Sequence, residues 1–456
     1  MTWAAKPGTL RTNRRWGTMP DGRDMGNQIG EGRTFLFLQG PHGPFFWRLA
    51  QRLRRTGATC LRVGFNWGDR VFWPERGTFL PHKAGIEAWP AAFDSLADTH
   101  GITDLVLYGD TRPVHALAIA RAKAQGITVH VFEEGYLRPW WITYERGGAN
   151  GHSPVMRMSI DDIRSAQATQ RHDPVEAPDR WGEMRQHVVY GAAYHAMVLA
   201  GGGNWAMAPH RALSVQQEFA LYLRRLAFMP AHWAARTIAT VRIKLGAYPF
   251  HLCLLQLDHD ASLRHHGAFA STSAFLRHVI DGFAKGAPSH HHLVMKAHPL
   301  EDGRVPQRRL IARYAKAAGI ADRVHYVRGG KLALLLGGAR SVVTVNSTAA
   351  QQALWRGLPV RAFGAAVYAK PELTSDQGIE AYFANPQPPD RAAYADFRQF
   401  LLETSQITGG YYSARGRRRL YRQLPDLMLA ATDRYAHMQN QGAAQAQHLK
   451  LIAANP

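Results

Sequence analysis

The sequence predicts an α/β fold in which two Rossmann-like domains face a central cleft. Two series of short apolar segments alternate with helical segments, the first from residue 34 and the second from about residue 250. Strands that alternate with helices form parallel sheets that are covered on both faces. The chain has 456 residues, of which 46 % are hydrophobic, and is long enough for two such domains. With a helical insert and C-terminal helices, this organisation is GT-B-like.

The first domain is expected over residues 33–156, after a flexible tail at residues 1–32 that is polar and rich in Gly and Arg. Its predicted strands are TFLFLQ, TCLRVGF, DLVLYGD and ITVHVF. An Arg-rich amphipathic helix follows the first of them, and an Ala-rich helix follows the third. Short apolar runs bounded by turn residues are typical of strands that are buried on both faces.

The second domain is expected over residues 250–390, with predicted strands HLCLLQ, HLVMKAH, RVHYV, SVVTVN and LPVRAFG. Residues 157–249 lack clear strand patterns and are interpreted as a helical insert or bridge, and residues 391–456 are predicted to be helical. No G-x-G-x-x-G follows the first strand, which argues against a nicotinamide or flavin dehydrogenase. Open parallel sheets bind ligands at the carboxyl ends of their strands, so the loops there hold the candidate site residues.

Two adjacent glutamates, Glu133 and Glu134, end a predicted strand in the segment VFEEGYLRPWW. Ionised carboxylates are rarely buried without a partner. One interpretation is that one glutamate pairs with Arg138 and caps the turn. The other is that one carboxylate acts as a base or nucleophile in the interdomain cleft, where it faces an electron-poor sugar carbon.

Two other loops of the first domain are candidates for the same cleft. The turn QGPHGPFF contains Gly40, and its backbone N–H groups are able to approach a ligand. The segment NWGDRVFWP combines Asn66, Asp69 and Arg70 with aromatic residues that suit a sugar or a glycerol head group. A plain turn and ordinary aromatic packing are the respective structural alternatives.

In the second domain, two predicted strand ends carry cationic and hydroxyl side chains. Lys296 and His298 follow one strand, and Asn346, Ser347 and Thr348 stand where another strand turns into a helix. Helix capping alone would explain the serine and threonine. A helix start also binds phosphate, and the cationic groups are on the same side, so the combination favours an anion site.

Metal binding is not expected. A D-x-D pair, Asp258 and Asp260, follows the first strand of the second domain. Such a pair holds a metal on a nucleotide diphosphate in glycosyltransferases of another fold, but alone it is a weak signal. The two cysteines, Cys60 and Cys253, lie far apart in apolar segments, which excludes a disulfide framework and a cysteine-based zinc site.

The chain is strongly basic. Its 55 Lys and Arg residues outnumber 34 Asp and Glu residues and give a formal net charge of +21, which attracts nucleic acid, anionic lipid or phosphorylated substrates. No zinc-finger, RRM or KH signature is found, so no nucleic-acid partner is expected. There is no secretory signal and no apolar run near the ~18 residues that span a bilayer, which predicts a cytoplasmic protein that is peripheral to a membrane.

Several of these segments occur together in one known family. They are LQGPHGPFFWRLAQRLRRTGATCLRVGFNWGDRVFWP, FEEGYLRPWWITYERGGANG, LLQLDHDASLRHHGAF, KAHP and VNSTAAQQALWRGLPV. From about residue 35 to residue 364 the chain resembles the capsule polysaccharide biosynthesis family of Gram-negative bacteria, and within it the KpsS (LipB) type. The N-terminal block is highly specific for this family, whereas KAHP alone is not.

The resemblance implies a glycosyltransferase that takes the acidic sugar Kdo from CMP-Kdo and forms a β-linkage. Its acceptor is implied to be phosphatidylglycerol or lysophosphatidylglycerol, an anionic phospholipid, on which the linker of a capsular polysaccharide begins. Three family motifs correspond here to Glu133-Glu134-Gly135, His298-Pro299 and Ser347-Thr348. This chain has Glu134 where the general motif has Asp, which leaves open which of the two glutamates reaches the anomeric carbon.

The resemblance also implies roles for individual residues. A β-donor and a β-product imply retention, so Glu134 is expected to attack the anomeric carbon. His298, with Lys296, Ser347 and Thr348, is expected to hold the departing CMP phosphate without a metal or other cofactor. The first domain would hold the acceptor and the catalytic carboxylates, and the second would bind the CMP-sugar. The remaining residues assigned to substrate binding are Gly40, Asn66, Asp69, Arg70, Arg138, Gln256, Arg264 and Asn346, with the three arginines as candidates for the Kdo carboxylate.

Two alternative functions remain open at this point. One is a non-catalytic capsule export or assembly protein that docks on the inner membrane and on an export complex. The other is a GT-B transferase that uses another nucleotide sugar and a metal at Asp258 and Asp260. The preferred reading has CMP-Kdo, the phospholipid acceptor, the inner-membrane surface and a capsule export complex as partners.

Overall fold

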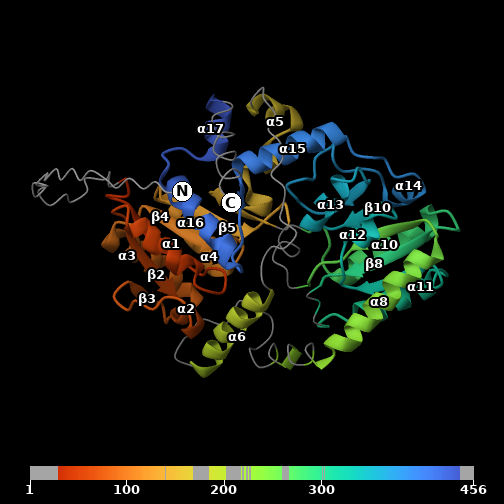
Figure 1. Ribbon diagram of the computed structural model, residues 1–456, viewed down its shortest axis with the longest axis horizontal. Coiled ribbons are helices and arrows are strands. Elements are labelled where there is room, and N and C mark those ends of the chain that lie inside the picture. The colour runs from red at the N-terminus through yellow and green to blue at the C-terminus, as the bar shows by residue number, and fades with distance from the viewer. Residues whose placement is uncertain are drawn as a thin grey trace, which may run out of the picture.

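The computed structural model describes residues 29–138, 140–167, 184–201, 217, 220–221, 224, 227–258, 267–299, 301 and 303–441. These residues form two α/β domains, and residues 406–429 return to the first of them (Figure 1). The two Rossmann-like domains expected from the alternation of strands and helices are therefore confirmed, and the fold is GT-B-like. Arg264 and Asp260 lie outside the described residues.

The first domain is built on a seven-stranded sheet. Its strand order is β12 (Gln406–Thr408), β6 (Trp141–Arg146), β5 (Thr128–Glu134), β4 (Asp104–Tyr108), β1 (Thr34–Phe37), β2 (Thr59–Gly64) and β3 (Phe79–Pro81). The strands predicted in this half of the chain are β1, β2, β4 and β5, and all of them pair in parallel.

Two strands at one edge of this sheet differ from the expected parallel pattern. β6 runs antiparallel to β5, and β12 runs antiparallel to β6. Only a short loop separates β5 from β6, whereas a parallel crossover needs a dozen or more residues, so the chain must turn back on itself. β12 comes from the segment that was predicted to be helical throughout, and its three residues are too few to give a pattern in the sequence.

Side chains of the parallel strands alternate between two helical layers. Phe35 and Phe37 of β1 pack with α1 (Phe45–Arg54) and α16 (Ala414–Leu429). The intervening Leu36 packs on the opposite face with α3 (Trp89–His100) and α4 (Pro113–Ala124). Because successive side chains point to opposite faces, a strand that is apolar throughout fills two cores at once.

The second domain has a five-stranded parallel sheet. Its order is β11 (Val360–Ala362), β10 (Ala339–Thr344), β7 (Phe250–Leu254), β8 (His292–Ala297) and β9 (Val324–Arg328). One face is covered by α10 (Thr272–Gly286), α11 (Gln307–Ala317) and α14 (Ile379–Ala384). The other face meets α8 (Met229–Gly246), α12 (Ala333–Leu336) and α13 (Gln351–Leu354).

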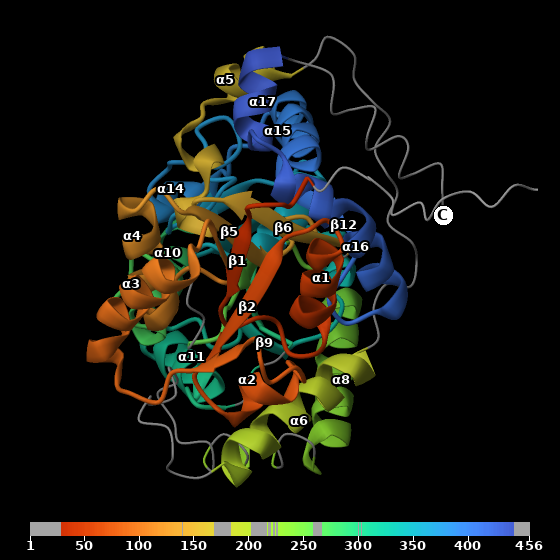
Figure 2. The same cartoon turned by 90° about the vertical axis from the view of Figure 1, so that its left-hand side faces the viewer.

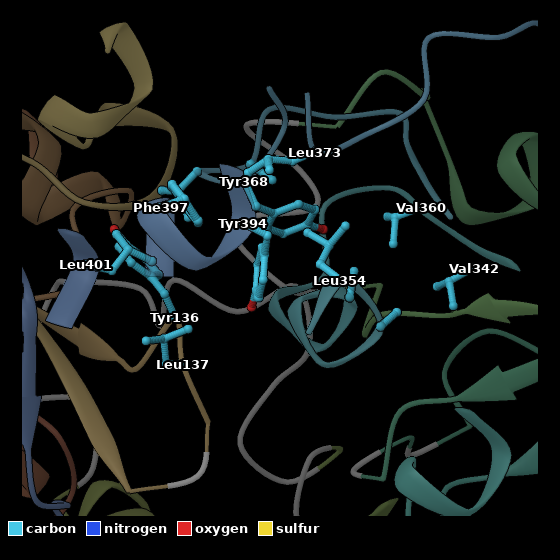
Figure 3. Packing of buried hydrophobic residues seen from close by; sticks show 14 of the residues in the cluster. Tyr136, Leu137, Val342, Leu354, Val360, Tyr368, Leu373, Tyr394, Phe397 and Leu401 are labelled. Atoms are coloured by element: carbon cyan, nitrogen blue, oxygen red, sulfur yellow. The ribbon is translucent and has the colours of Figure 1, made fainter. Parts of the chain in front are cut away.

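One hydrophobic core joins the two domains. Tyr136 and Leu137, in the loop after β5, belong to the same buried cluster as Leu354 of α13 and Phe397 of α15 (Arg391–Thr404) (Figure 3). This cluster therefore holds the end of β5 against the second domain.

Smaller elements complete the structure. They are α2 (Trp67–Val71), α5 (Ile160–Ala166), α6 (Met184–Ala200), α17 (Arg434–Gln441) and the 3₁₀ turns η1 (Ile86–Ala88), η2 (Asn150–His152), η3 (Pro154–Arg157) and η4 (Thr348–Ala350). Figure 2 shows α5, α15 and α17 grouped at one end of the molecule, and α2, α6 and α8 at the other. None of the helices in the described ranges is both long enough and apolar enough to cross a bilayer.

Candidate functional site

Glu133 and Glu134 are the last two residues of β5 and are both partly buried. The backbone N–H of Glu134 donates to Oε1 of Glu133 at 2.9 Å, and the Tyr108 hydroxyl donates to Oε1 of Glu134 at 3.1 Å. The Tyr411 hydroxyl donates to the backbone carbonyl of Glu133 at 3.0 Å. Each carboxylate therefore has its own hydrogen-bond donor, and tyrosines from β4 and from the segment after β12 surround the pair.

The two carboxylates have different surroundings. Burial raises the pKa of Glu133 to about 7, and the negative charges of Glu134 and Asp110 act in the same direction. The hydrogen bond from the N–H of Glu134 and the positive charge of Arg138 oppose this rise only in part. A carboxyl with a pKa near 7 exchanges its proton readily at neutral pH, which is the property of a general acid or base.

This pKa predicts how stability depends on pH. Between pH 4.5, the ordinary pKa, and about 7, folded Glu133 holds more proton than the unfolded chain does, so its contribution to stability falls as pH rises. The Glu133→Gln variant has no carboxyl at this position, so it lacks this loss of stability with rising pH. The unfolding temperature of the variant relative to the wild type should therefore be higher at about pH 8 than at about pH 5. A difference that stays constant between these pH values would contradict the prediction.

The glycine that follows the two glutamates has no space for a side chain. A Cβ on Gly135 would lie 2.2 Å from the backbone carbonyl oxygen of Trp141. That oxygen belongs to β6, which pairs with β5, so the close approach is part of the sheet itself. The requirement for glycine here is therefore steric.

Gly135→Ala is expected to lower the free energy of unfolding by at least about 2 kcal/mol, because the added methyl group forces the β5–β6 turn apart. Urea unfolding followed by circular dichroism measures the change. Gly378→Ala is the matched control, since a Cβ there meets nothing within 4 Å. If both substitutions changed the free energy of unfolding equally, the β5–β6 turn would accommodate the added methyl group without a steric cost.

The loop after Gly135 reaches the second domain. The Nε2 of Gln351 in α13 donates to the backbone carbonyl of Tyr136 at 3.0 Å, and Tyr394 donates to the carbonyl of Gln351 at 2.9 Å. Gln351 is buried and lies four residues after Ser347. This contact links the segment that carries the two glutamates directly to the segment that carries the predicted phosphate-binding hydroxyls.

The predicted anion-binding residues of the second domain lie at one edge of its sheet. Lys296 of β8 is level with Leu254 of β7, which is level with Thr344 of β10. His298, Gln256 and Asn346 each follow two residues beyond this row. The structure thus brings together side chains from three strand ends, as the topology predicts.

Two of these residues are hydrogen-bonded to each other. The Nε2 of Gln256 donates to Oδ1 of Asn346 at 2.8 Å, and the backbone N–H of Asn346 donates to Oε1 of Gln256 at 3.1 Å. Both side chains are buried. This reciprocal pair fixes the ends of β7 and β10 and thereby positions Ser347, the next residue.

Lys296 is buried, whereas His298 is only partly buried. Burial lowers the pKa of Lys296 to about 8, and the charge of Arg236 in α8 adds to this effect. Its Nζ donates to the backbone carbonyl of Ala297 at 3.5 Å. An anion bound beside this ammonium would favour its charged form.

Ser347 acts as a cap. Its hydroxyl accepts from the N–H of Ala349 at 3.3 Å, and its carbonyl accepts from the Tyr368 hydroxyl at 2.7 Å. The helix predicted to start here is a 3₁₀ turn, η4, followed by the short α13. Thr348 is the first residue of η4 and is partly buried.

In the first domain, Asp69 and Asn66 belong to a buried polar network. Asp69 accepts from the N–H of Phe65 at 2.9 Å and from Arg62 at 3.3 Å. Asn66 accepts from the N–H of Asp69 at 2.9 Å and donates to the Tyr194 hydroxyl of α6 at 2.9 Å. The structure therefore shows these two residues holding the β2–α2 turn.

Other predicted site residues also make local contacts. Arg70 donates to the carbonyls of Trp73 and Pro74 in its own loop, and the exposed Arg138 donates through Nε to the carbonyl of Gly135 at 3.1 Å. A Cβ on Gly40 would meet the Phe46 ring at 2.5 Å, so this glycine permits close packing of the turn.

Sequence reasoning missed Tyr108, Tyr411 and Gln351, which contact the carboxylates or the loop behind them. Tyr108 lies near the end of the predicted strand DLVLYGD and is the last residue of β4, and this position was the available signal. Tyr411 and Gln351 are 278 and 215 residues from their partners. No local pattern could have indicated these two contacts.

The D-x-D pair is only partly described. Asp258 accepts from the Thr272 hydroxyl at 2.8 Å, while Asp260 lies outside the described residues. Within the described ranges, no group of three or more His, Cys, Asp and Glu side chains is placed to hold a metal ion. The expectation that the donor phosphate is held without a metal stays a prediction.

Comparison with known proteins gives consistent names. Residues 103–412 match the family described as Capsule polysaccharide biosynthesis protein. The chain is 28 % identical over 401 residues to the Capsule polysaccharide modification protein LipB of Neisseria meningitidis serogroup B, which covers 86 % of this chain and 94 % of that protein. It is 30 % identical over 399 residues to the Capsule polysaccharide export protein KpsS of Escherichia coli, with 84 % and 97 % covered. Among solved structures, the β-Kdo 2,7 transferase KpsC of Thermosulfurimonas dismutans matches at 13 % identity and a TM-score of 0.37, over 80 % of this chain and 89 % of that chain.

Proposed function

This chain belongs to the capsule polysaccharide biosynthesis protein family, and we propose that it is a retaining β-Kdo glycosyltransferase. It takes Kdo from CMP-Kdo and adds it to phosphatidylglycerol or lysophosphatidylglycerol, and this addition initiates the linker of a capsular polysaccharide. The names of the curated relatives support a role in capsule polysaccharide modification or export. The identity of the sugar donor, the identity of the lipid acceptor and the β-linkage are our proposals.

One observation carries the proposal. The two glutamates at the end of β5 are joined, through the loop from Gly135 to Leu137, to the segment that contains Ser347 and Thr348. The Gln351–Tyr136 hydrogen bond and the shared buried core make this connection. A glycosyltransferase with a nucleotide-activated donor needs carboxylates near the sugar and cationic or hydroxyl groups near the phosphate, on opposite domains.

The chemistry follows from the two carboxylates. The Glu134 carboxylate forms a bond to the anomeric carbon of Kdo, and the bond from that carbon to the phosphate oxygen breaks, so CMP leaves with the electron pair. The acceptor hydroxyl oxygen then bonds to the same carbon and releases Glu134. Glu133, with its pKa of about 7, accepts the hydroxyl proton. Two displacements at one carbon retain its configuration.

The second domain supplies the groups for the leaving phosphate. Lys296 and His298 contribute positive charge, and Ser347 and Thr348 contribute hydroxyl donors, so a single phosphate needs no metal. For the Kdo carboxylate the candidates are Arg138, Arg70 and Arg264, although Arg70 would first have to leave the carbonyls of its own loop. We further propose that the protein acts in the cytoplasm at the surface of the inner membrane, where it meets its lipid acceptor and a capsule export complex.

A direct assay tests the proposal. Purified protein is incubated with CMP-Kdo and a fluorescent lysophosphatidylglycerol, and the products are analysed by mass spectrometry. Addition of one or more Kdo units to the lipid, also in the presence of EDTA, is expected. Transfer from another nucleotide sugar but not from CMP-Kdo would overturn the donor assignment. Absence of transfer from every donor would favour the non-catalytic export role suggested by the name of the E. coli relative.

A further inference from the structure

Exposed apolar side chains are concentrated on one side of the molecule. Of thirteen large apolar side chains that are exposed in the described part of the chain, eight lie between residues 188 and 245, on α6, on α8 or directly before α8. Single exposed apolar residues are common on soluble proteins, but a concentration of them marks an interaction surface. In Figures 1 and 2, α6 and α8 both extend to the same lower edge of the molecule.

Helix α8 has two apolar faces, and only one of them is used for packing. Its inner face carries Ile243, which is buried in the interdomain core, and His232, which contacts Arg328 of β9. The opposite face is a stripe of Ala234, Ile238, Val241 and Leu245, all of them exposed. Their spacing of four, three and four residues places these side chains along one line of the helix.

Helix α6 repeats this arrangement on the first domain. Its inner side carries Tyr194, which contacts Asn66 of the β2–α2 turn. Val189, Ala192, Ala196 and Leu199 are exposed and are again spaced by three or four residues. Each domain therefore contributes one helix whose outer stripe is apolar and uncovered in this structure.

The surroundings of the α8 stripe are strongly basic. Arg242 and Lys244 flank it, and a cavity of about 960 Å³ opens between α8, β9 and α11. Phe228 and Ile238 line this cavity together with arginines, and the acidic residue in its lining is Glu301. The arginines are Arg224, Arg242, Arg308, Arg309 and Arg328. Apolar side chains beside a cluster of cations suit an amphiphile with an anionic head.

We propose that the exposed faces of α6 and α8 dock the protein on a bilayer of anionic phospholipid, with Trp233 and the α8 stripe entering the interface. The charge of the cavity and the net charge of +21 select this occupant over an acidic or neutral surface. Trp233 is 59 % exposed, and tryptophan is enriched at the boundary between lipid and water.

Helix α8 also lies beside the proposed donor site. Arg236, on the inner side of this helix, acts on the pKa of Lys296, and its Cδ would lie 3.0 Å from a Cβ on Gly330. The inner side of α8 thus lies beside Gly330, which follows β9, and the charge of Arg236 reaches Lys296 at the end of β8. The inference deepens the proposed function, because a lipid acceptor has to be taken from a bilayer, but it is tested without turnover.

Co-sedimentation with vesicles tests the surface. Vesicles of phosphatidylcholine and phosphatidylserine in equal parts are anionic and lack the proposed acceptor, so binding reports docking alone. We expect the wild type to sediment with them and not with pure phosphatidylcholine. Trp233→Ala combined with Leu245→Ser should weaken binding at least about tenfold. Both side chains are exposed, so folding should be unchanged, and circular dichroism checks this.

Trp355→Ala is the matched control, because Trp355 is 52 % exposed but follows α13 and belongs to neither α6 nor α8. It should bind vesicles as the wild type does. The proposal would be overturned if the double variant bound vesicles as tightly as the wild type. It would also be overturned if the wild type were a dimer and the double substitution produced a monomer without changing vesicle binding. Transfer of Kdo to a detergent-dispersed acceptor is measured separately, so failure of docking and failure of the proposed reaction give different results.

Discussion

Replacement of Glu134 by glutamine is expected to lower the rate of Kdo transfer from CMP-Kdo by at least about 10³-fold, because the amide cannot form the covalent bond to the anomeric carbon. The substitution keeps the size of the side chain, and its oxygen can still accept the hydrogen bond from the Tyr108 hydroxyl. The variant should therefore remain folded and should still bind CMP-Kdo. Mass spectrometry of the lipid product gives the rate.

Glu133→Gln is the matched control for this prediction. The two residues are adjacent in β5 and both are partly buried, and burial raises the pKa of Glu133 to about 7. Loss of a general base costs about 10²- to 10⁴-fold and changes the pH profile of kcat, whereas loss of the nucleophile removes turnover at every pH. If Glu133→Gln abolishes transfer at all pH values and Glu134→Gln keeps most of it, the two roles are exchanged.

A second large effect is expected at Asp69. Asp69→Ala should lower the free energy of unfolding by about 3–5 kcal/mol, because it leaves the buried Arg62 guanidinium without its counter-charge. Arg62 and Asp69 are 5 % and 2 % exposed, and the pair is separated by 3.3 Å. The substitution also removes the acceptor for the N–H of Phe65. Urea unfolding followed by tryptophan fluorescence measures the loss.

Asp94→Ala provides the comparison. Asp94 forms an ion pair with Arg121 on the surface, where solvent screens the interaction, so its removal should cost much less stability than removal of Asp69. Similar losses for the two variants would mean that the Arg62–Asp69 pair is no better shielded than a surface pair. Asp69 would then be free to serve as a sugar-binding residue, the role first expected for it.

The sequence alone was enough for the parallel strands of both domains except β3, a strand of three residues that pairs with β2 and was not predicted. Segments such as TFLFLQ and HLCLLQ are apolar throughout, because each strand is buried on both faces, and this signal is local. Placement of candidate residues at strand ends followed from topology, since parallel strands present their carboxyl ends at one edge. This reasoning predicts that Lys296 and Asn346 lie at strand ends of the second domain, and the structure brings both to the same edge of its sheet.

Sequence could not indicate which polar residues near the site are structural. Asp69 and Asn66 are candidates for sugar binding, and in the structure they hold the β2–α2 turn, so their role in sugar binding stays a prediction. An Asp–Arg pair is recognised only when both side chains are seen to be buried at contact distance. β12 was missed for a related reason, because its partner β6 is more than 260 residues away in the chain.

In the segment VFEEGYLRPWW, the position of two carboxylates at a strand end was determined by sequence. Their surroundings were decided by tertiary structure, which brings Tyr411 and Gln351 from distant segments to this strand end and to the loop behind it. The same division holds for α8. Its apolar spacing indicates a helix, but a periodic stripe reads the same whether it faces a core or solvent. Only packing shows that Ile243 faces inward and Leu245 outward, because burial depends on contacts between residues that are far apart in the chain.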